Sequence, residues 1–386
     1  MNKNRFVNLR FTSGLASLSF GLFSIAAVIA ILLLSDLDAR KGHKDSGNVH
    51  GLKRIALVQH ASLPPLDEGI KGVLAGLASR GFVEGKSIAL SRYNAQGDLS
   101  VANAIAAQVT NADFDLIITA STPSLQTVAN ANRSKATPSP HVFGITSDPY
   151  RAGVNISREK HLDHPPYMAG IGSMAPIREL FELLRTINPN LHRIGLVWNP
   201  TESNSEAATL LARAAAVEFG MELIEGNAES STVAGEVAQS VIARGVDVFW
   251  VSPDITVYTA LDVISKAARS AGIPLVTSLP GSVGRGSLLD LGARYEAIGY
   301  VQGLLTADVL DGRDTATIPV ENWIPVDLNL NLNLLDDHKA NWHIGSELLA
   351  RASLVIDASG TRKQELKRPD PPSFLHWDRS SEKPGA

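Results

Sequence analysis

Three acidic residues stand where the chain passes from a predicted strand into a predicted helix, and they are Asp148, Glu202 and Asp254. A carboxylate in such a loop can accept an ammonium group, or it can simply stabilise the positive end of the helix dipole, which is worth about 0.3 to 1 kcal/mol. For one acid alone the dipole is the better explanation. Three acids around one predicted cleft favour a site for a cation.

The segment Ser121-Thr122-Pro123 is typical of a helix start, with a hydroxyl at the cap and proline in the first turn. Such an end presents free backbone N–H groups that can hold a carboxylate or a phosphate. Simple capping explains these residues equally well, because Ser252-Pro253 has the same form. Together with the acids, an anion site here would suit a zwitterion such as an α-amino acid. Four aromatic residues could line the walls or pack in the core: Tyr93, Tyr150, Trp198 and Tyr258.

Other motifs that could carry chemistry are incomplete. Gly281 to Gly286 is rich in glycine but lacks the Lys-Ser/Thr of a phosphate-binding loop, so a turn is expected. His161 and His164 precede two prolines, which favours a loop over a metal site. The chain has neither a Gly-x-Ser-x-Gly elbow nor the glycine fingerprint of dinucleotide binding. We therefore expect no enzyme activity, no cofactor and no metal.

The loops with these residues belong to two similar halves. Arg54 to His60 and Arg193 to Asn199 each begin a series of alternating strands and helices, and Phe114 to Ser121 corresponds to Val246 to Ser252. Short, continuous apolar strands suit parallel sheets that are covered on both faces. The pattern predicts an α/β protein with two doubly wound Rossmann-like lobes, whose parallel sheets are joined by a hinge. Ligands bind beyond the carboxyl ends of such strands.

The pattern changes after Pro280, where we expect a strand at 287–292, a helix at 295–310, an extended segment at 317–326 and a closing helix at 346–356. These elements would return the chain to each lobe in turn, so the lobes are expected to be discontinuous in sequence. We assign residues 53–150 with about 281–320 to the first lobe, 151–280 with about 321–357 to the second, and 358–386 to a disordered tail.

The N-terminal residues predict a route to the membrane. Residues 1–10 are basic, and the apolar run at 11–35 is long enough to span a bilayer. The basic flank places the first ten residues in the cytoplasm and the chain beyond the run, starting with a stalk at 36–52, across the membrane. A retained anchor is favoured over a cleaved signal peptide, because Leu37-Asp38-Ala39 is a poor cleavage site.

Composition excludes several classes of function. A chain of 386 residues allows two domains, and its net charge of -4 gives no basic field for nucleic acid. The chain contains no cysteine, so disulfides, thiol catalysis and an N-terminal lipid on cysteine are excluded.

From Arg54 to Ile356 the chain resembles the tryptophan- and tyrosine-type substrate-binding proteins of ABC transporters. The most specific part is Asn199-Pro-Thr-Glu-Ser-Asn-Ser205. The other matching phrases are Tyr93 to Asp98, Ala120 to Pro123, Thr146 to Pro149, Val251 to Asp254 and Ala316 to Glu321. The resemblance implies a type I periplasmic binding fold. It also implies that eight residues contact the ligand: Asn199, Glu202, Asn204 and Ser205 from the second lobe, Ser121, Thr122 and Asp148 from the first, and Asp254 from the opposite wall.

We therefore expect a solute-binding protein of an ABC importer, anchored on the periplasmic side of the inner membrane, that presents a small amino-acid-like ligand to a permease. The alternative is a membrane-tethered ligand-sensing ectodomain that signals through a partner protein, because only residues 1–10 would remain in the cytoplasm.

Overall fold

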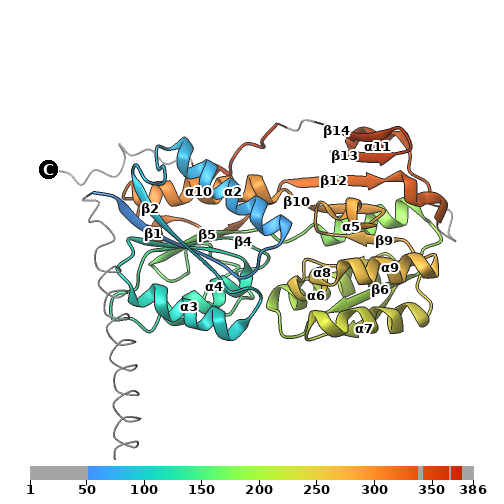
Figure 1. The fold of residues 1–386 in the computed structure, drawn as a ribbon, viewed down its shortest axis with the longest axis horizontal. Helices are drawn as coiled ribbons and strands as arrows, with labels where there is room; N and C mark the ends of the chain where they lie inside the picture. The colour runs from blue at the N-terminus through green and yellow to red at the C-terminus, as the bar shows by residue number, and fades with distance from the viewer. Residues whose placement is uncertain (1–50, 338–341, 365–366, 376–386) are drawn as a thin grey trace, which may run out of the picture. The chain divides into compact units, whose positions relative to one another are not determined.

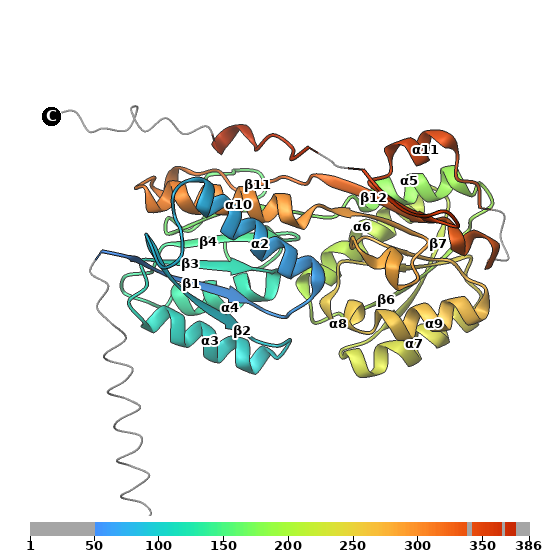
Figure 2. The ribbon, with the colours of Figure 1, turned by 45° about the horizontal axis from the view of Figure 1, so that its top comes forward.

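The computed structural model describes residues 51–337, 342–364 and 367–375. Within them, two sheets each carry helices on both faces, as Figures 1 and 2 show. The predicted α/β class with two sheets of mainly parallel strands is confirmed. We define each lobe by its sheet and the helices packed on that sheet.

The first lobe contains β1 (Lys53–Gln59), α2 (Pro64–Ser79), β2 (Ile88–Asn94), α3 (Leu99–Asn111), β3 (Leu116–Ala120), α4 (Thr122–Asn132), β4 (His141–Thr146), β5 (Met168–Gly172), α10 (Tyr295–Leu310) and β11 (Glu321–Asn322). Its strand order is β2-β1-β3-β4-β5-β11, with all pairs parallel. Alternate residues of β1 are buried on opposite faces: Ile55 and Leu57 pack with α2 and α10, and Ala56 and Val58 pack with α3 and α4. An apolar run therefore suits a strand that is covered twice.

The second lobe contains α5 (Ile177–Ile187), β6 (Arg193–Trp198), α6 (Ser203–Glu218), β7 (Glu222–Asn227), α7 (Ser231–Ala243), β8 (Val248–Val251), α8 (Ile255–Thr259), α9 (Leu261–Ala271), β9 (Leu275–Thr277), β10 (Leu289–Ala293), β12 (Val326–Asn331), α11 (Ser346–Arg351), β13 (Leu354–Asp357) and β14 (Gly360–Lys363). Its strand order is β7-β6-β8-β9-β10-β12-β13-β14. The first four strands repeat the arrangement β2-β1-β3-β4 of the first lobe. The similarity between the two halves of the sequence therefore corresponds to a repeated strand order.

Strand pairing divides the lobes at different residues from those we expected. β5 lies beyond residue 151 but pairs with β4 in the first sheet, where all five of its residues are buried. β10 lies within 281–320 but pairs with β9 and β12 in the second sheet. The chain consequently crosses between the lobes at 173–176, at Arg294 and at 323–325.

The C-terminal part also differs from the expectation. The helix expected at 346–356 ends at Arg351, and β13 follows it and pairs with β12, because Val355 packs in the core of the second lobe. The expected disordered tail contains β14, which pairs with β13, and a short 3₁₀ turn at Ser373–Leu375. Only its residues 365–366 and 376–386 lie outside the described part of the chain.

The expected cytoplasmic end, anchor and most of the stalk also lie outside the described residues, at 1–50. Among the residues that the structure does describe, no helix is both long and apolar enough to cross a bilayer.

Helices α2 and α10 lie side by side on the first sheet with their backbones in direct contact, as Figure 1 shows. Glycines make this approach possible. A Cβ added at Gly299 would lie 1.9 Å from the backbone oxygen of Gly69, and one at Gly76 would lie 2.2 Å from the backbone oxygen of Tyr300. No side chain larger than hydrogen fits at these positions unless the helices separate.

We expect Gly299→Ala to lower the free energy of unfolding by about 1 to 3 kcal/mol, because overpacking outweighs alanine's helix preference of about 1 kcal/mol. Urea titration followed by circular dichroism measures the change. Gly345→Ala is the control, because nothing lies within 4 Å of its added Cβ and its φ of -71° suits any residue. Equal stability of the two variants would contradict the proposed backbone contact.

Candidate functional site

The carboxyl ends of β6 and β8 bring two acidic side chains to the N-terminus of α8. Asp254 is the N-cap of this helix, and its Oδ1 accepts a hydrogen bond from the N–H of Val257 at 2.8 Å. Its Oδ2 accepts from the N–H of Asn199 at 2.7 Å and from the hydroxyl of Ser205 at 2.5 Å. These contacts tie the loop after β6 to the loop after β8.

The Asp254 side chain has no exposure to solvent. Burial raises the pKa of its carboxyl to about 7, and the neighbouring Glu202 carboxylate raises it further, while its three donors oppose the shift.

Glu202 contributes the second carboxylate to the same helix end. Its Oε1 accepts from the N–H of Thr256 at 3.0 Å and from the Thr256 hydroxyl at 2.5 Å. Its Oε2 accepts from the N–H of Ile255 at 3.1 Å and from the Asn204 amide at 3.1 Å. The first N–H groups of α8 are thus satisfied within the protein, which leaves none of them to hold a ligand.

On the first lobe, Ser121 caps α4 as predicted: its Oγ accepts from the N–H of Ser124 at 3.3 Å. Its φ of 127° is strained for a residue with a side chain. Ile145, at the end of β4, also has a positive φ of 53°. Such strain persists only where the surrounding structure enforces it, and it is often found at functional sites.

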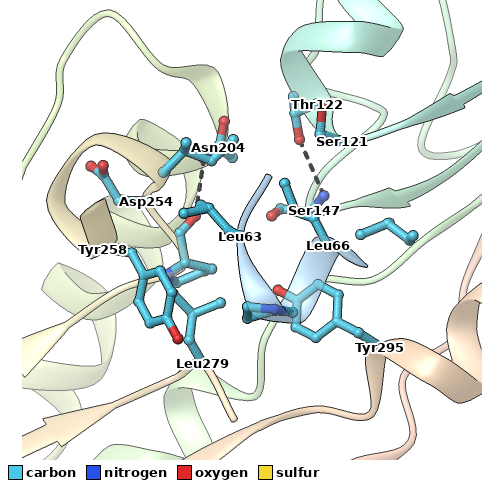
Figure 3. Close-up of a pocket in the computed structure, with 14 residues that line it drawn as sticks. Leu63, Leu66, Ser121, Thr122, Ser147, Asn204, Asp254, Tyr258, Leu279 and Tyr295 are labelled. Atoms are coloured by element: carbon cyan, nitrogen blue, oxygen red, sulfur yellow. Dashed lines mark hydrogen bonds between the residues drawn. The ribbon is translucent and has the colours of Figure 1, made fainter. Parts of the chain in front are cut away.

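A cavity of about 40 Å³ lies between the lobes (Figure 3). Its polar lining consists of Ser121, Thr122, Ser147, Asn204 and Asp254. The side chains of Tyr258 and Tyr295 and several aliphatic residues complete it. We call this the inner cavity. Its volume is well below the roughly 300 to 1,000 Å³ of common ligand pockets.

A second cavity of about 680 Å³, the outer cavity, is also lined by both lobes. Its polar residues include His60, Gln96, Asn199, Glu202 and Glu229. Leu63 and Ile255 line both cavities, so they lie where the two cavities adjoin. Figure 3 shows Leu63 between the second-lobe side chains and Ser147 of the first lobe.

The charged groups around the two cavities are acidic. Asp254 lines the inner cavity, and Glu202 and Glu229 line the outer one. Among the described residues, no lysine or arginine lines either cavity. His60 is the one other titratable cation there, and burial lowers its pKa. The cleft therefore favours a ligand that carries a positive charge.

Six of the eight residues predicted for ligand contact line these cavities. Ser121, Thr122, Asn204 and Asp254 line the inner cavity, and Asn199 and Glu202 line the outer cavity. Ser205 lines neither cavity, because it is fully buried behind Asp254. Contact of these residues with a ligand stays a prediction.

Asp148 also lines neither cavity. Its Oδ2 pairs with the guanidinium of Arg158 at 2.5 Å, and its Oδ1 accepts from the N–H groups of Tyr150 and Arg151. The carboxylate therefore holds its own loop together. The neighbouring Ser147 lines the inner cavity instead.

Of the four aromatic residues considered for the walls, only Tyr258 lines a cavity. Trp198 lies under Arg213, Tyr150 under Arg158, and Tyr93 packs edge-on against Phe114. Leu63, which precedes α2, and Tyr295, which begins α10, were not predicted to line the cleft. Leu63 stands directly before Pro64-Pro65, a helix start that could have drawn attention to it.

Comparison with known proteins places the chain among proteins of similar architecture. The sequence model of the ABC transporter substrate binding protein family matches residues 54–356. A tyrosine-binding protein of Clostridioides difficile is 28% identical over 316 residues, which cover 81% of this chain and 89% of that protein.

Two solved structures have the same fold, each with a TM-score of 0.72. A conserved domain protein from Vibrio cholerae is 28% identical, and the match covers 78% of this chain and 99% of that one. The ABC domain in complex with L-Trp from Streptococcus pneumonia is 24% identical, and the match covers 79% of this chain and 100% of that one.

The raised pKa of Asp254 predicts how stability changes with pH. A carboxyl group with a higher pKa in the folded chain binds its proton more tightly there than in the unfolded chain. The free energy of unfolding therefore falls as the pH rises from 3.8, the pKa of the unfolded state, to about 7, the pKa of the folded state. Asp290, which is also buried with a pKa raised to about 7, acts in the same direction. We expect Asp254→Asn to make this decrease in the free energy of unfolding less steep, by at most about 1.4 kcal/mol per pH unit. Urea titrations at pH 5, 6 and 7 measure it, and an unchanged slope would be the contrary result.

Proposed function

Since the chain belongs to the ABC transporter substrate-binding protein family, whose members bind solutes and are not enzymes, we propose that it binds a small amino-acid-like solute between its lobes. The bound solute would then be presented to a membrane permease. The observation that carries this proposal is the inner cavity, to which both lobes contribute polar and aromatic side chains.

We assign the two ends of a zwitterionic solute to opposite lobes. Asn204, whose Oδ1 is buried without a partner, and the carboxylates behind it can receive the ammonium group. The start of α4, with the hydroxyls of Ser121 and Thr122, can receive the carboxylate. Tyr258 and Tyr295 supply apolar surface for the side chain of the solute. This assignment places the charges of the solute beside groups of suitable polarity.

The solute would enter while the lobes are apart. The inner cavity of about 40 Å³ is too small for an amino acid, whereas ligand pockets are commonly 300 to 1,000 Å³. In this structure the lobes touch across the cleft: Leu63 packs against the core of the second lobe, and Ile255 packs against that of the first. A solute that contacts both lobes would favour a slightly expanded closed arrangement over the open one.

We further propose that the apolar run at 11–35 tethers the protein to the outer face of the inner membrane, where a permease would receive the solute. The run is uncharged, and basic residues precede it. The family supports an extracytoplasmic location for the lobes.

We expect L-tyrosine or L-tryptophan to bind, because the relatives named above bind or contain these amino acids. Glu202→Gln should weaken binding about tenfold, because it removes a charge that faces the cleft from the α8 end. Isothermal titration calorimetry measures the affinity. Glu84→Gln is the control, because Glu84 lines neither cavity and pairs with Arg92 at the surface. Equal affinities for the two variants would show that Glu202 does not contribute to solute binding.

Native mass spectrometry of the freshly purified protein would identify a different solute.

We expect the full chain to remain in the membrane fraction after a carbonate wash, and its N-terminal peptide to be detected by mass spectrometry. A mature protein that starts near residue 40 would instead show that the segment is cleaved.

Affinity capture of the full chain from solubilised membranes tests the partner: recovery of a permease supports transport, and recovery of a signalling protein supports the alternative of a sensing ectodomain.

A further inference from the structure

Residues 367–375, which we call the strap, lie beyond β14 of the second lobe and return to the first lobe, as Figure 2 shows. The match to the family ends at residue 356. The strap therefore lies outside the part of the chain that the family model matches.

The strap holds the first lobe through α10. The Arg368 guanidinium pairs with Glu296 at 2.6 Å and stacks 3.8 Å from the ring centre of Tyr300. Phe374 and Leu375 are partly buried against two apolar clusters of the first lobe, both of which include residues of α2 and α10. An ion pair, a cation–π contact and apolar burial thus attach the strap to the first lobe together.

The strap also reaches the hinge. The Arg294 guanidinium donates to the carbonyl of Lys367 at 3.1 Å, and Arg294 forms one of the three crossings between the lobes. The same side chain lies 3.3 Å from the carboxylate of Asp327, which stands next to another crossing. One arginine thus joins two crossings and the strap.

The connection from the second lobe to the strap is short. Gln364 is fixed to the second lobe, because its N–H donates to the carbonyl of Ser353 at 2.8 Å. Arg368, only four residues later, is fixed to α10. Four residues span at most about 14 Å when fully extended. Any motion of the lobes that separates these two points further must break one of the attachments.

We propose that the strap is a fourth connection between the lobes, which restricts hinge opening and raises the affinity of the cleft for its solute. A contact that limits the open state shifts the population toward the closed state. The inference about affinity rests on the proposed function, but the inference about opening does not.

The test compares the full chain with a variant that lacks residues 365–386. Because the chain has no cysteine, Gln108→Cys and Ser240→Cys provide two unique spin-label sites, both exposed, on α3 of the first lobe and α7 of the second. Pulsed electron paramagnetic resonance then measures the distance between the lobes in detergent without solute. We expect the deletion to broaden the distribution and extend it to longer distances. We also expect the dissociation constant for L-tyrosine to rise about three- to tenfold.

Two controls separate the strap from general damage. Deletion of residues 376–386 alone leaves the strap in place and should leave the distances unchanged. Arg368→Ala combined with Phe374→Ala should reproduce the effect of the longer deletion, whereas Arg362→Ala, on β14, should not. Identical distance distributions for the full chain and the longer deletion would overturn the proposal. If no variant binds tyrosine but the distances still change, the strap stands and the identity of the solute is wrong.

Discussion

The direct backbone contact between α2 and α10 is the constraint on which the cleft depends. The chain reaches α10 only after it has left the second lobe through Arg294, so this contact is what returns it to the first lobe. The N-terminus of α2 carries Leu63, and that of α10 begins with Tyr295; both side chains border the inner cavity. The same glycine-based packing that completes the first lobe therefore also fixes two walls of the cavity.

The second lobe holds two carboxylates close together, one of them fully buried. Asp254 and Glu202 share the N-terminus of α8, where backbone N–H groups and hydroxyls satisfy both. The cost of burial appears in the raised pKa of Asp254. This arrangement makes the loops after β6 and β8 rigid, so the lining of the cleft is prepared before a solute arrives.

Much of the fold followed from local patterns in the sequence. The apolar runs predicted the strands, since strands covered on both faces need such runs, and Ser121-Thr122-Pro123 predicted the start of α4. The pairing of Asp148 could not be predicted, because Arg158 lies in an irregular loop with no periodic signal. The return of the helix at 295–310 to the first lobe was predicted, but the sequence does not show that its first residue, Tyr295, borders the cavity. The strap was missed because its prolines and charges are typical of disorder.

The position of Leu63 and Ile255, which line both cavities, bears on the kinetics of solute release. A molecule that passes from the inner cavity to the outer one moves past these two side chains, which belong to different lobes. Separation of the lobes moves these two side chains apart, so the rate of that motion contributes to the residence time of a molecule that leaves by this route. A change in the bulk of either aliphatic side chain would therefore alter how long a molecule stays as well as the space that is left for it.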